Sequence, residues 1–301
     1  MKSSAKTFFL LSLCLLIFTA FAPAQSRRNV KTTDEGGTIL SVVASHGEKS
    51  DAPIKADSLF LYENGVEQKI KNFTFDPSPS KIVLVVDNSQ TIQPEIENLK
   101  AAVMEFAYEI FEGDELYVIA YDNEPAIIQD WTGDAKKIEK SLSTFRKQGN
   151  PFLFDALNAT VNEVLLPLMP GTRKTAIVLI SDGLDRGSKT QFDKILAEMQ
   201  DDNITVYALQ IPDRTGGAYR RNQPKAADVI TQLTEGTGGT IFSFDEAQLA
   251  AKTICEELRK NRYLLSYFPT NNSTYDARRV FLVAQEGITV RTKAAHPPNV
   301  K

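Results

Sequence analysis

The sequence predicts an α/β fold: a doubly wound, mostly parallel sheet with one antiparallel edge strand and helices on both faces, plus a small β module built from both termini. Three observations predict it. The apolar runs Ile82–Val86 and Thr175–Ile180 indicate strands buried on both faces. Helical and strand patterns alternate between residues 79 and 262. Strand patterns without a helical period lie on either side, at 37–75 and 263–293.

Residues 1–24 have the organisation of a signal peptide. Lys2 and Lys6 precede the apolar run Phe8–Ala22, which is shorter than the roughly 20 residues that a membrane-spanning helix needs. Small residues at Ala22-Pro23-Ala24 indicate a cleavage site, so we expect Gln25 to begin the mature chain. An uncleaved membrane anchor is the alternative. The sequence therefore predicts an exported protein, which is periplasmic, cell-surface or secreted.

Composition indicates which partners the chain can bind and what stabilises its fold. Loss of the signal peptide changes the net charge from -4 to -6, because 34 basic residues become 32 against 38 acidic ones. A mildly acidic chain argues against nucleic acid as a ligand. Cys255 becomes the only cysteine, so no disulfide can form within the mature chain and a hydrophobic core must stabilise it. We expect no transmembrane segment after signal cleavage.

The two arms are predicted to pair with each other. The N-terminal arm, 25–78, contains Asn64-Gly65 between strand patterns, which is typical of a hairpin with a type I′ turn. The C-terminal arm, 263–293, shows three more strand patterns. Because chain termini often lie close together, we expect the arms to form one module. The tail 294–301 is expected to be disordered.

The block from 79 to 262 divides into alternating elements. The short connection between its second and third strands allows only an antiparallel pair. Asn150 is expected to cap the third helix, with Pro151 at its first position. The expected strands are Ile82–Val86, Glu115–Tyr121, Ala126–Trp131, Thr175–Ile180, Ile204–Ile211 and Thr240–Phe244, and the expected helices are Pro94–Phe111, Ala135–Phe145, Phe152–Leu166, Gln191–Met199, Ala226–Thr234 and Glu246–Arg262.

An oxygen-rich loop follows the first of these strands. Asp87, Ser89 and Thr91 are spaced two apart directly after Val86. Ligands of open α/β sheets bind at the carboxyl ends of the strands. Carboxylate and hydroxyl oxygens suit a hard divalent cation. The loop therefore predicts a cation site; the alternative is that Ser89 and Thr91 cap the following helix.

With these elements in order, the chain resembles a von Willebrand factor type A domain. The resemblance is carried by Asp87-x-Ser89-x-Thr91 and by Ser181-Asp182-Gly183 after the strand Thr175–Ile180. More narrowly, it is similar to bacterial exported VWFA-related proteins with flanking β arms. That likeness is carried by Leu61-Tyr62-Glu63-Asn64-Gly65, Gln68-Lys69-Ile70, Leu153-Phe154-Asp155-Ala156-Leu157, Thr237-Gly238-Gly239 and Tyr263-Leu264-Leu265-Ser266-Tyr267-Phe268-Pro269.

The resemblance implies a metal-ion-dependent adhesion site that holds Mg²⁺ or Mn²⁺. Asp87, Ser89 and Thr91 would be ligands from the first loop and Asp182 the acid of the third, and a partner's carboxylate often completes such a site. The chain departs from the family at the second loop, where Pro151 stands in place of the usual threonine.

Three residues could compensate for that loss or support the site. Asn150 or Asp155 could supply the missing oxygen. Asp185 could orient the site from outside the ligand set, although a solvated loop acid is the preferred interpretation.

A basic loop should lie at the same edge of the sheet. The segment 212–225 follows a parallel strand and carries Arg214, Tyr219, Arg220 and Arg221. Such a loop favours a partner with an acidic contact surface. A solvated mobile loop is the alternative.

The sequence thus predicts an exported, non-enzymatic binding or adhesion protein that engages an acidic protein ligand through a cation. A metal-free interaction or envelope-assembly module on the same fold is the second hypothesis. A metal-assisted hydrolase with Asp155 or Asp185 as general base is the third.

Overall fold

The computed structural model describes residues 37–47, 52–169, 171, 174–213, 224–271 and 275–298. The predicted signal peptide, 1–24, lies outside the described residues. So do four residues of the predicted partner-binding loop, which are Arg214, Tyr219, Arg220 and Arg221.

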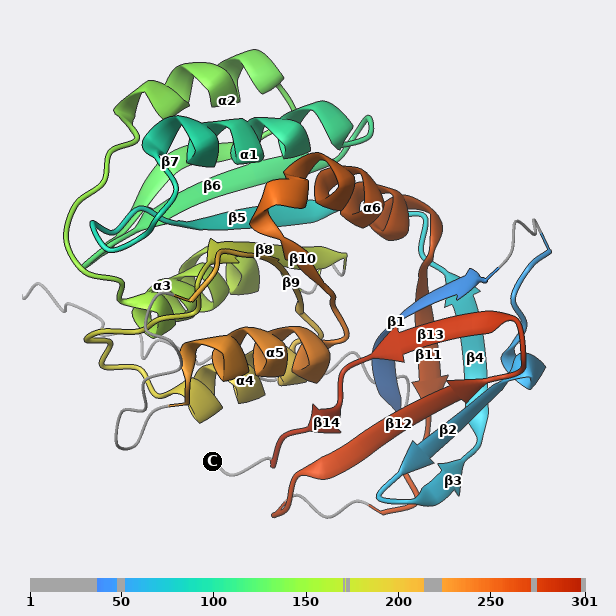
Figure 1. Cartoon of the computed structure of the whole chain (residues 1–301). Helices are drawn as coiled ribbons and strands as arrows, with labels where there is room; N and C mark the ends of the chain where they lie inside the picture. The colour runs from blue at the N-terminus through green and yellow to red at the C-terminus, as the bar shows by residue number, and fades with distance from the viewer. Residues whose placement is uncertain are drawn as a thin grey trace, which may run out of the picture. The chain divides into compact units, whose positions relative to one another are not determined.

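The α/β block is built on a six-stranded sheet with the order β10-β9-β8-β5-β6-β7 (Figure 1). All neighbouring strands are parallel except β6 and β7 at one edge. This arrangement confirms the predicted mostly parallel sheet with one antiparallel edge strand. The strands are β5 Lys81–Asp87, β6 Glu115–Tyr121, β7 Pro125–Thr132, β8 Thr175–Ser181, β9 Thr205–Gln210 and β10 Ile241–Ser243.

Helices cover both faces of this sheet, as Figure 1 shows. Alternate side chains of β5 serve separate cores: Leu84 packs in the core with α1, α2 and α6, whereas Val83 and Val85 pack in the core with α3, α4 and α5. The helices are α1 Ile96–Glu109, α2 Ala135–Ser141, α3 Leu153–Ala159, α4 Phe192–Asp201, α5 Ala226–Thr237 and α6 Ala247–Lys260. Short 3₁₀ helices at Leu142–Thr144 and Phe244–Glu246 flank α2 and α6.

The third helix differs from the prediction at both ends. It begins at Leu153 after Phe152, so Asn150 is not its cap and Pro151 is not its first residue. The amide of Phe152 donates instead to the carbonyl of Asp122, at 2.9 Å, which holds the chain outside the helix up to that point. Beyond Ala159 the helix widens into a π-helix, Thr160–Leu165, and ends in a 3₁₀ turn, Leu166–Leu168.

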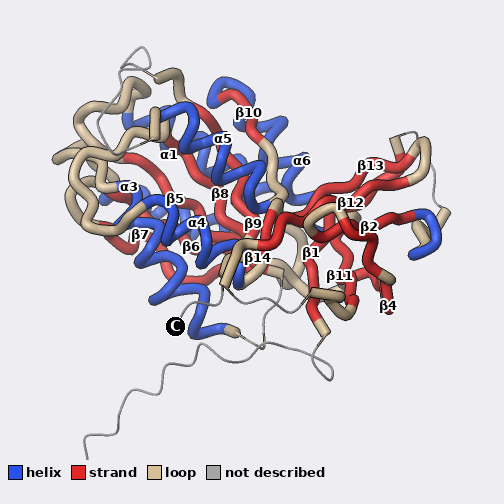
Figure 2. The backbone as a smooth tube through the Cα atoms, turned by 90° about the horizontal axis from the view of Figure 1, so that it is seen from below, coloured by secondary structure: helices blue, strands red, loops and turns tan. Residues whose placement is uncertain are grey.

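The two arms form a β module of two four-stranded sheets, with the orders β13-β1-β11-β4 and β14-β12-β2-β3. Figure 2 shows that the module consists almost entirely of strands and loops. Strand β1 pairs with β11 and β13, and β2 pairs with β12, which confirms that both termini build it. Its elements are β1 Thr38–His46, the 3₁₀ helix Ala56–Ser58, β2 Leu59–Glu63, β3 Val66–Gln68, β4 Ile70–Phe75, β11 Arg262–Tyr267, β12 Arg278–Ala284, β13 Ile288–Thr292 and β14 Ala295–His296.

The prediction of a disordered tail was wrong at its start. Strand β14 pairs with Arg278 and Arg279 of β12. The imidazole of His296 is buried, with its Nε2 2.9 Å from the hydroxyl of Tyr267. A buried ring with a hydrogen-bond partner orders these residues.

Buried cations join the module to the α/β block. The guanidinium of Arg262 donates to the Oγ1 of Thr205 at 2.6 Å, and the ammonium of Lys174 donates to the carbonyl of Asp76 at 2.6 Å. Both cationic side chains are almost fully buried, so each depends on these acceptors. Across the described residues no helix is long and apolar enough to cross a membrane.

Candidate functional site

Three neighbouring strands end at the candidate site. Asp87 is the last residue of β5, and its register partner on β6 is Tyr121. On the other side, Val86 is opposite Ile180 of β8, so Asp87 lies level with Ser181. Parallel pairing thus brings these three side chains together at the carboxyl edge, as the sequence predicted for Asp87.

The first loop turns its polar side chains inward. The amide of Ser89 donates to Oδ1 of Asp87 at 2.8 Å, and the Oγ of Ser89 lies 3.0 Å from the Oγ1 of Thr91. Helix α1 begins only at Ile96, after Glu95. The alternative that Ser89 and Thr91 cap this helix was therefore wrong, and their hydroxyls remain directed at the loop.

Two buried carboxylates lie side by side at this edge. Asp87 is 1% exposed and Asp182 is 2% exposed. Oδ2 of Asp87 is buried and has no hydrogen-bond partner within the described part of the chain. Burial raises the pKa of Asp87 to about 7; hydrogen bonds from Ser89 lower it, and the charge of Asp182 raises it. Asp182 thus places a second negative charge near the buried carboxyl of Asp87.

The third loop holds Asp182 through a tight backbone turn. Gly183 has φ +81°, and a Cβ at this position would lie 2.2 Å from the carbonyl oxygen of Ala226. Only glycine fits both constraints. The amide of Gly183 donates to the Oγ of Ser181 at 2.9 Å, and the amide of Leu184 donates to Oδ1 of Asp182 at 2.9 Å.

The second loop docks on the first through its backbone. The amide of Gln148 donates to the carbonyl of Asn88 at 2.9 Å, and the side chain of Asn88 donates to the carbonyl of Arg146 at 2.8 Å. Lys147 adds a hydrogen bond from its ammonium to the carbonyl of Pro94, at 2.9 Å. The two loops are therefore held together although position 151 has no side-chain oxygen. The backbone carbonyl of Pro151 accepts the amide of Arg186.

The residues expected to replace the missing threonine are placed differently. Asn150 is exposed, and its amide donates to Oδ1 of Asn123 at 2.7 Å. Both carboxylate oxygens of Asp155 accept backbone amides, from Lys189 at 3.0 Å and Thr190 at 2.8 Å. These bonds lower the pKa of Asp155, although burial opposes them. Asp155 anchors the third loop in this structure.

Asp185 of the third loop in turn accepts a backbone amide at the start of α3. Its Oδ1 accepts the amide of Phe154 at 3.2 Å, and its Oδ2 accepts the amides of Gly187 and Ser188, each at 3.3 Å. Asp185 is 5% exposed, so the interpretation as a solvated loop acid was wrong. First-turn amides of a helix lack intrahelical partners, and Asp185 satisfies one of them.

Asp87 thus contacts Ser89, whose hydroxyl contacts that of Thr91, and the charge of Asp182 acts on the Asp87 carboxyl. Among the described residues, no three His, Cys, Asp or Glu side chains gather as a metal group. Sequence reasoning missed Tyr121, whose hydroxyl lies 2.8 Å from the Oγ of Ser181. A tyrosine as the last residue of an apolar strand beside β5 was the available signal.

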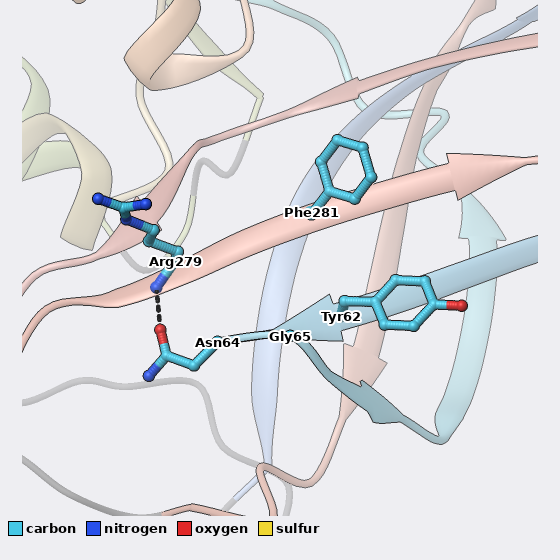
Figure 3. A pocket seen from close by; sticks show the side chains of 5 residues that line it. All are labelled: Tyr62, Asn64, Gly65, Arg279 and Phe281. Carbon is cyan, nitrogen blue, oxygen red and sulfur yellow. Dashed lines mark hydrogen bonds between the residues drawn. The ribbon is translucent and has the colours of Figure 1, made fainter.

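A separate hollow of about 660 Å³ lies on the β module (Figure 3). Tyr62 and Phe281, which are register partners on β2 and β12, line it together with Asn64, Gly65 and Arg279. Oδ1 of Asn64 accepts the amide of Arg279 at 2.8 Å. The hollow is lined by none of Asp87, Ser89, Thr91 and Asp182, the residues of the candidate site at the carboxyl edge of the six-stranded sheet, hereafter the sheet-edge site.

Comparison with known proteins identifies the α/β block. A family model described as the von Willebrand factor type A domain matches residues 81–257. A solved von Willebrand factor type A structure from Catenulispora acidiphila has a TM-score of 0.50 at 10% identity, over 88% of this chain and 75% of that one. That likeness concerns the fold alone.

Two further solved structures are similar over a smaller part of the chain. An aerotolerance-related membrane protein from Bacteroides fragilis NCTC 9343, with multiple mutations to serines, has a TM-score of 0.46 at 20% identity, covering 60% of this chain and 99% of that one. BatB from Bacteroides thetaiotaomicron has a TM-score of 0.46 at 19% identity, covering 60% and 98%. No curated protein matches the chain.

Proposed function

Because the chain belongs to the von Willebrand factor type A domain family, whose members bind protein partners, we propose that it is an exported, non-enzymatic binding protein. It engages an acidic group of a protein partner through Mg²⁺ or Mn²⁺ at the carboxyl edge of the six-stranded sheet. Asp87, Ser89, Thr91 and Asp182 hold the cation. Export is supported by the signal-peptide pattern of residues 1–24.

The observation that carries this proposal is the unpartnered Oδ2 of Asp87. A buried carboxylate oxygen beside a second carboxylate is costly unless a proton or a cation compensates it. The paired hydroxyls of Ser89 and Thr91 add the neutral oxygens that Mg²⁺ accepts alongside water. When bound, the cation supplies a positive charge that can pair with a carboxylate of the partner.

Exposed basic side chains around the site support an acidic partner. Arg146 of the second loop and Arg186 and Lys189 of the third are exposed. The sequence places Arg214, Arg220 and Arg221 on the loop after β9. Complementary charge of this kind accelerates encounter and discriminates against basic partners.

Metal titration into the mature chain, residues 25–301, tests the cation site. Calorimetry with Mn²⁺ should detect binding to the wild type and to Asp193→Ala, which removes an exposed acid of α4. Asp87→Asn should abolish the heat of binding. Absence of binding to the wild type at millimolar Mn²⁺ and Mg²⁺ would contradict the cation site.

A metal-free interaction or envelope-assembly module is the second candidate. It is favoured by Pro151, which supplies no side-chain oxygen, and by the engagement of Asp155 and Asp185 with backbone amides. Capture of partners from the envelope fraction, in Mg²⁺ and in chelator, separates the two. Capture that ignores the chelator and the Asp87→Asn change supports the second candidate.

A further inference from the structure

We propose that Tyr121 is a positioning residue of the sheet-edge site: its hydroxyl, bridged to Ser181, fixes the carboxylate of Asp87 from the neighbouring strand. The inference rests on the proposed function, because the carboxylate it positions is the one that would hold the cation. Tyr121 touches neither partner nor cation, so its effect is exerted through Asp87.

The first support is the row that the three residues form across the sheet. Asp87 pairs with Tyr121 on one side and lies level with Ser181 on the other. Alternation along each strand places all three on one face, the face that packs against α3, α4 and α5, because Val85, Ile119 and Leu179 two residues earlier belong to that core.

The second support is the hydrogen bond that spans the row. The hydroxyl of Tyr121 on β6 lies 2.8 Å from the Oγ of Ser181 on β8. Since β5 lies between these strands, this bond passes beside the end of β5, where Asp87 projects from the same face. Both bridging side chains are fully buried, so the bridge is a rigid boundary for the Asp87 side chain.

The third support is that few other contacts hold this carboxylate. Oδ1 of Asp87 accepts the amide of Ser89, whereas Oδ2 has no hydrogen-bond partner among the described residues. The first loop therefore restrains one oxygen, and the buried bridge of Tyr121 and Ser181 bounds the side chain from the neighbouring strands.

The fold provides a matched control. Tyr207 is also a buried tyrosine of this sheet, on β9, and its hydroxyl also donates to a side chain, Glu257. Tyr207 faces the opposite core, however. Tyr121→Phe and Tyr207→Phe therefore remove the same group at comparable burial, and only the first removes it from the site.

Mn²⁺ affinity and the position of the Asp87 carboxylate test the inference in the full mature chain. Tyr121→Phe should weaken Mn²⁺ binding by roughly 10-fold or more, as loss of a supporting hydrogen-bond partner does at other metal sites. In chelator, crystal structures should show the Asp87 carboxylate displaced in Tyr121→Phe relative to the wild type. Tyr207→Phe should leave both quantities unchanged, while thermal melts check that each variant is folded.

The outcomes separate this inference from the proposed function. Equal Mn²⁺ affinity in Tyr121→Phe and the wild type would overturn the positioning role and leave the cation site intact. Absence of Mn²⁺ binding to the wild type would overturn the cation site. In that case an unchanged position of the Asp87 carboxylate in Tyr121→Phe would overturn the positioning role as well, and a displaced carboxylate would support it.

Discussion

The ammonium of Lys293 lies 2.6 Å from the carbonyl oxygen of Gln200, in the last turn of α4. The side chain is 4% exposed, so a cation from the C-terminal arm is buried at the end of a helix of the α/β block. Carbonyls at a helix C-terminus lack intrahelical donors, and a positive charge there is favourable. The amide of Ala294 adds a bond to the carbonyl of Gly236 in α5, at 3.0 Å. The C-terminal arm thereby caps two helices.

Lys293→Met should lower the free energy of unfolding by about 1–3 kcal/mol, because the carbonyl of Gln200 loses its short bond from the ammonium and keeps the longer one from the amide of Asn203, at 3.4 Å. Urea denaturation monitored by circular dichroism measures the change. Lys260→Met is the control, since Lys260 forms an exposed i,i+4 pair with Glu256 and should change stability by about 0.5 kcal/mol or less. Equal effects of the two substitutions would show that the cap does not stabilise the fold.

Gly183→Ala and Gly65→Ala separate backbone strain from steric exclusion. The two glycines have nearly equal φ, +81° and +80°. An added Cβ meets the carbonyl of Ala226 at Gly183 but meets nothing within 4 Å at Gly65. Gly65→Ala should cost about 1–2 kcal/mol from the left-handed backbone alone. In the same urea experiment, Gly183→Ala should lower the free energy of unfolding clearly more than Gly65→Ala does. It should also weaken Mn²⁺ binding because Asp182 moves. Equal losses in the two variants would show that the third loop shifts to accommodate the added Cβ.

The raised pKa of Asp87 predicts a pH-dependent stability in chelator. The unfolded carboxyl titrates near 3.8 and the folded one near 7, so between these values the folded state binds a proton that the unfolded state lacks. The stabilisation from this group is therefore complete below pH 3.8 and is lost as the pH rises through about 7. It amounts to roughly 4 kcal/mol at most, at about 1.4 kcal/mol per pKa unit.

Comparison with Asp87→Asn isolates this contribution. Urea titrations at several pH values should show the wild type losing stability relative to Asp87→Asn as the pH rises. Saturating Mn²⁺ should remove the loss, because a cation favours the charged carboxylate. A difference between the two proteins that stays flat with pH would show that the Asp87 carboxyl has the same pKa in the folded and unfolded states.

A double-mutant cycle tests the link between β13 and α6. Arg291 forms an ion pair with Glu257, which also accepts the hydroxyl of Tyr207. Arg291→Met, Glu257→Gln and the double variant should give a coupling energy of about 0.5–3 kcal/mol in unfolding experiments, as contacting residues in one network do. A coupling energy near zero would show that the ion pair of Arg291 and Glu257 contributes as little to stability as an exposed pair does.

The sheet and the first loop could be predicted because their signals are local. β6 was predicted at its observed bounds, Glu115–Tyr121, and β5 and β8 within a residue or two, since fully apolar runs have one stable place in an α/β fold. Asp87 ends β5 and Ser89 lies two residues beyond it, so the position of the strand alone sets theirs.

The second loop could not be predicted, because its conformation depends on partners distant in sequence. Pro151 precedes α3 without starting it, since Asp122 holds Phe152 and Asp185 accepts the amide of Phe154. Asp155 was considered as a ligand because of its place on the helix, whereas its oxygens accept amides from Lys189 and Thr190. His296 likewise orders β14 through Tyr267, a contact that hydropathy does not reveal.

The pairing of the arms also sets the order in which the molecule can be completed. The Oγ1 of Thr292 donates to the carbonyl of Ser41 at 2.8 Å across 251 positions of sequence. Strand β1 is synthesised before the whole α/β block, yet its partners β11 and β13 are made after it. Its apolar residues Leu40 and Val42 therefore wait unpaired during synthesis, when an open strand edge invites aggregation. The earliest strand that the structure describes can therefore be paired only after the C-terminal arm has been made.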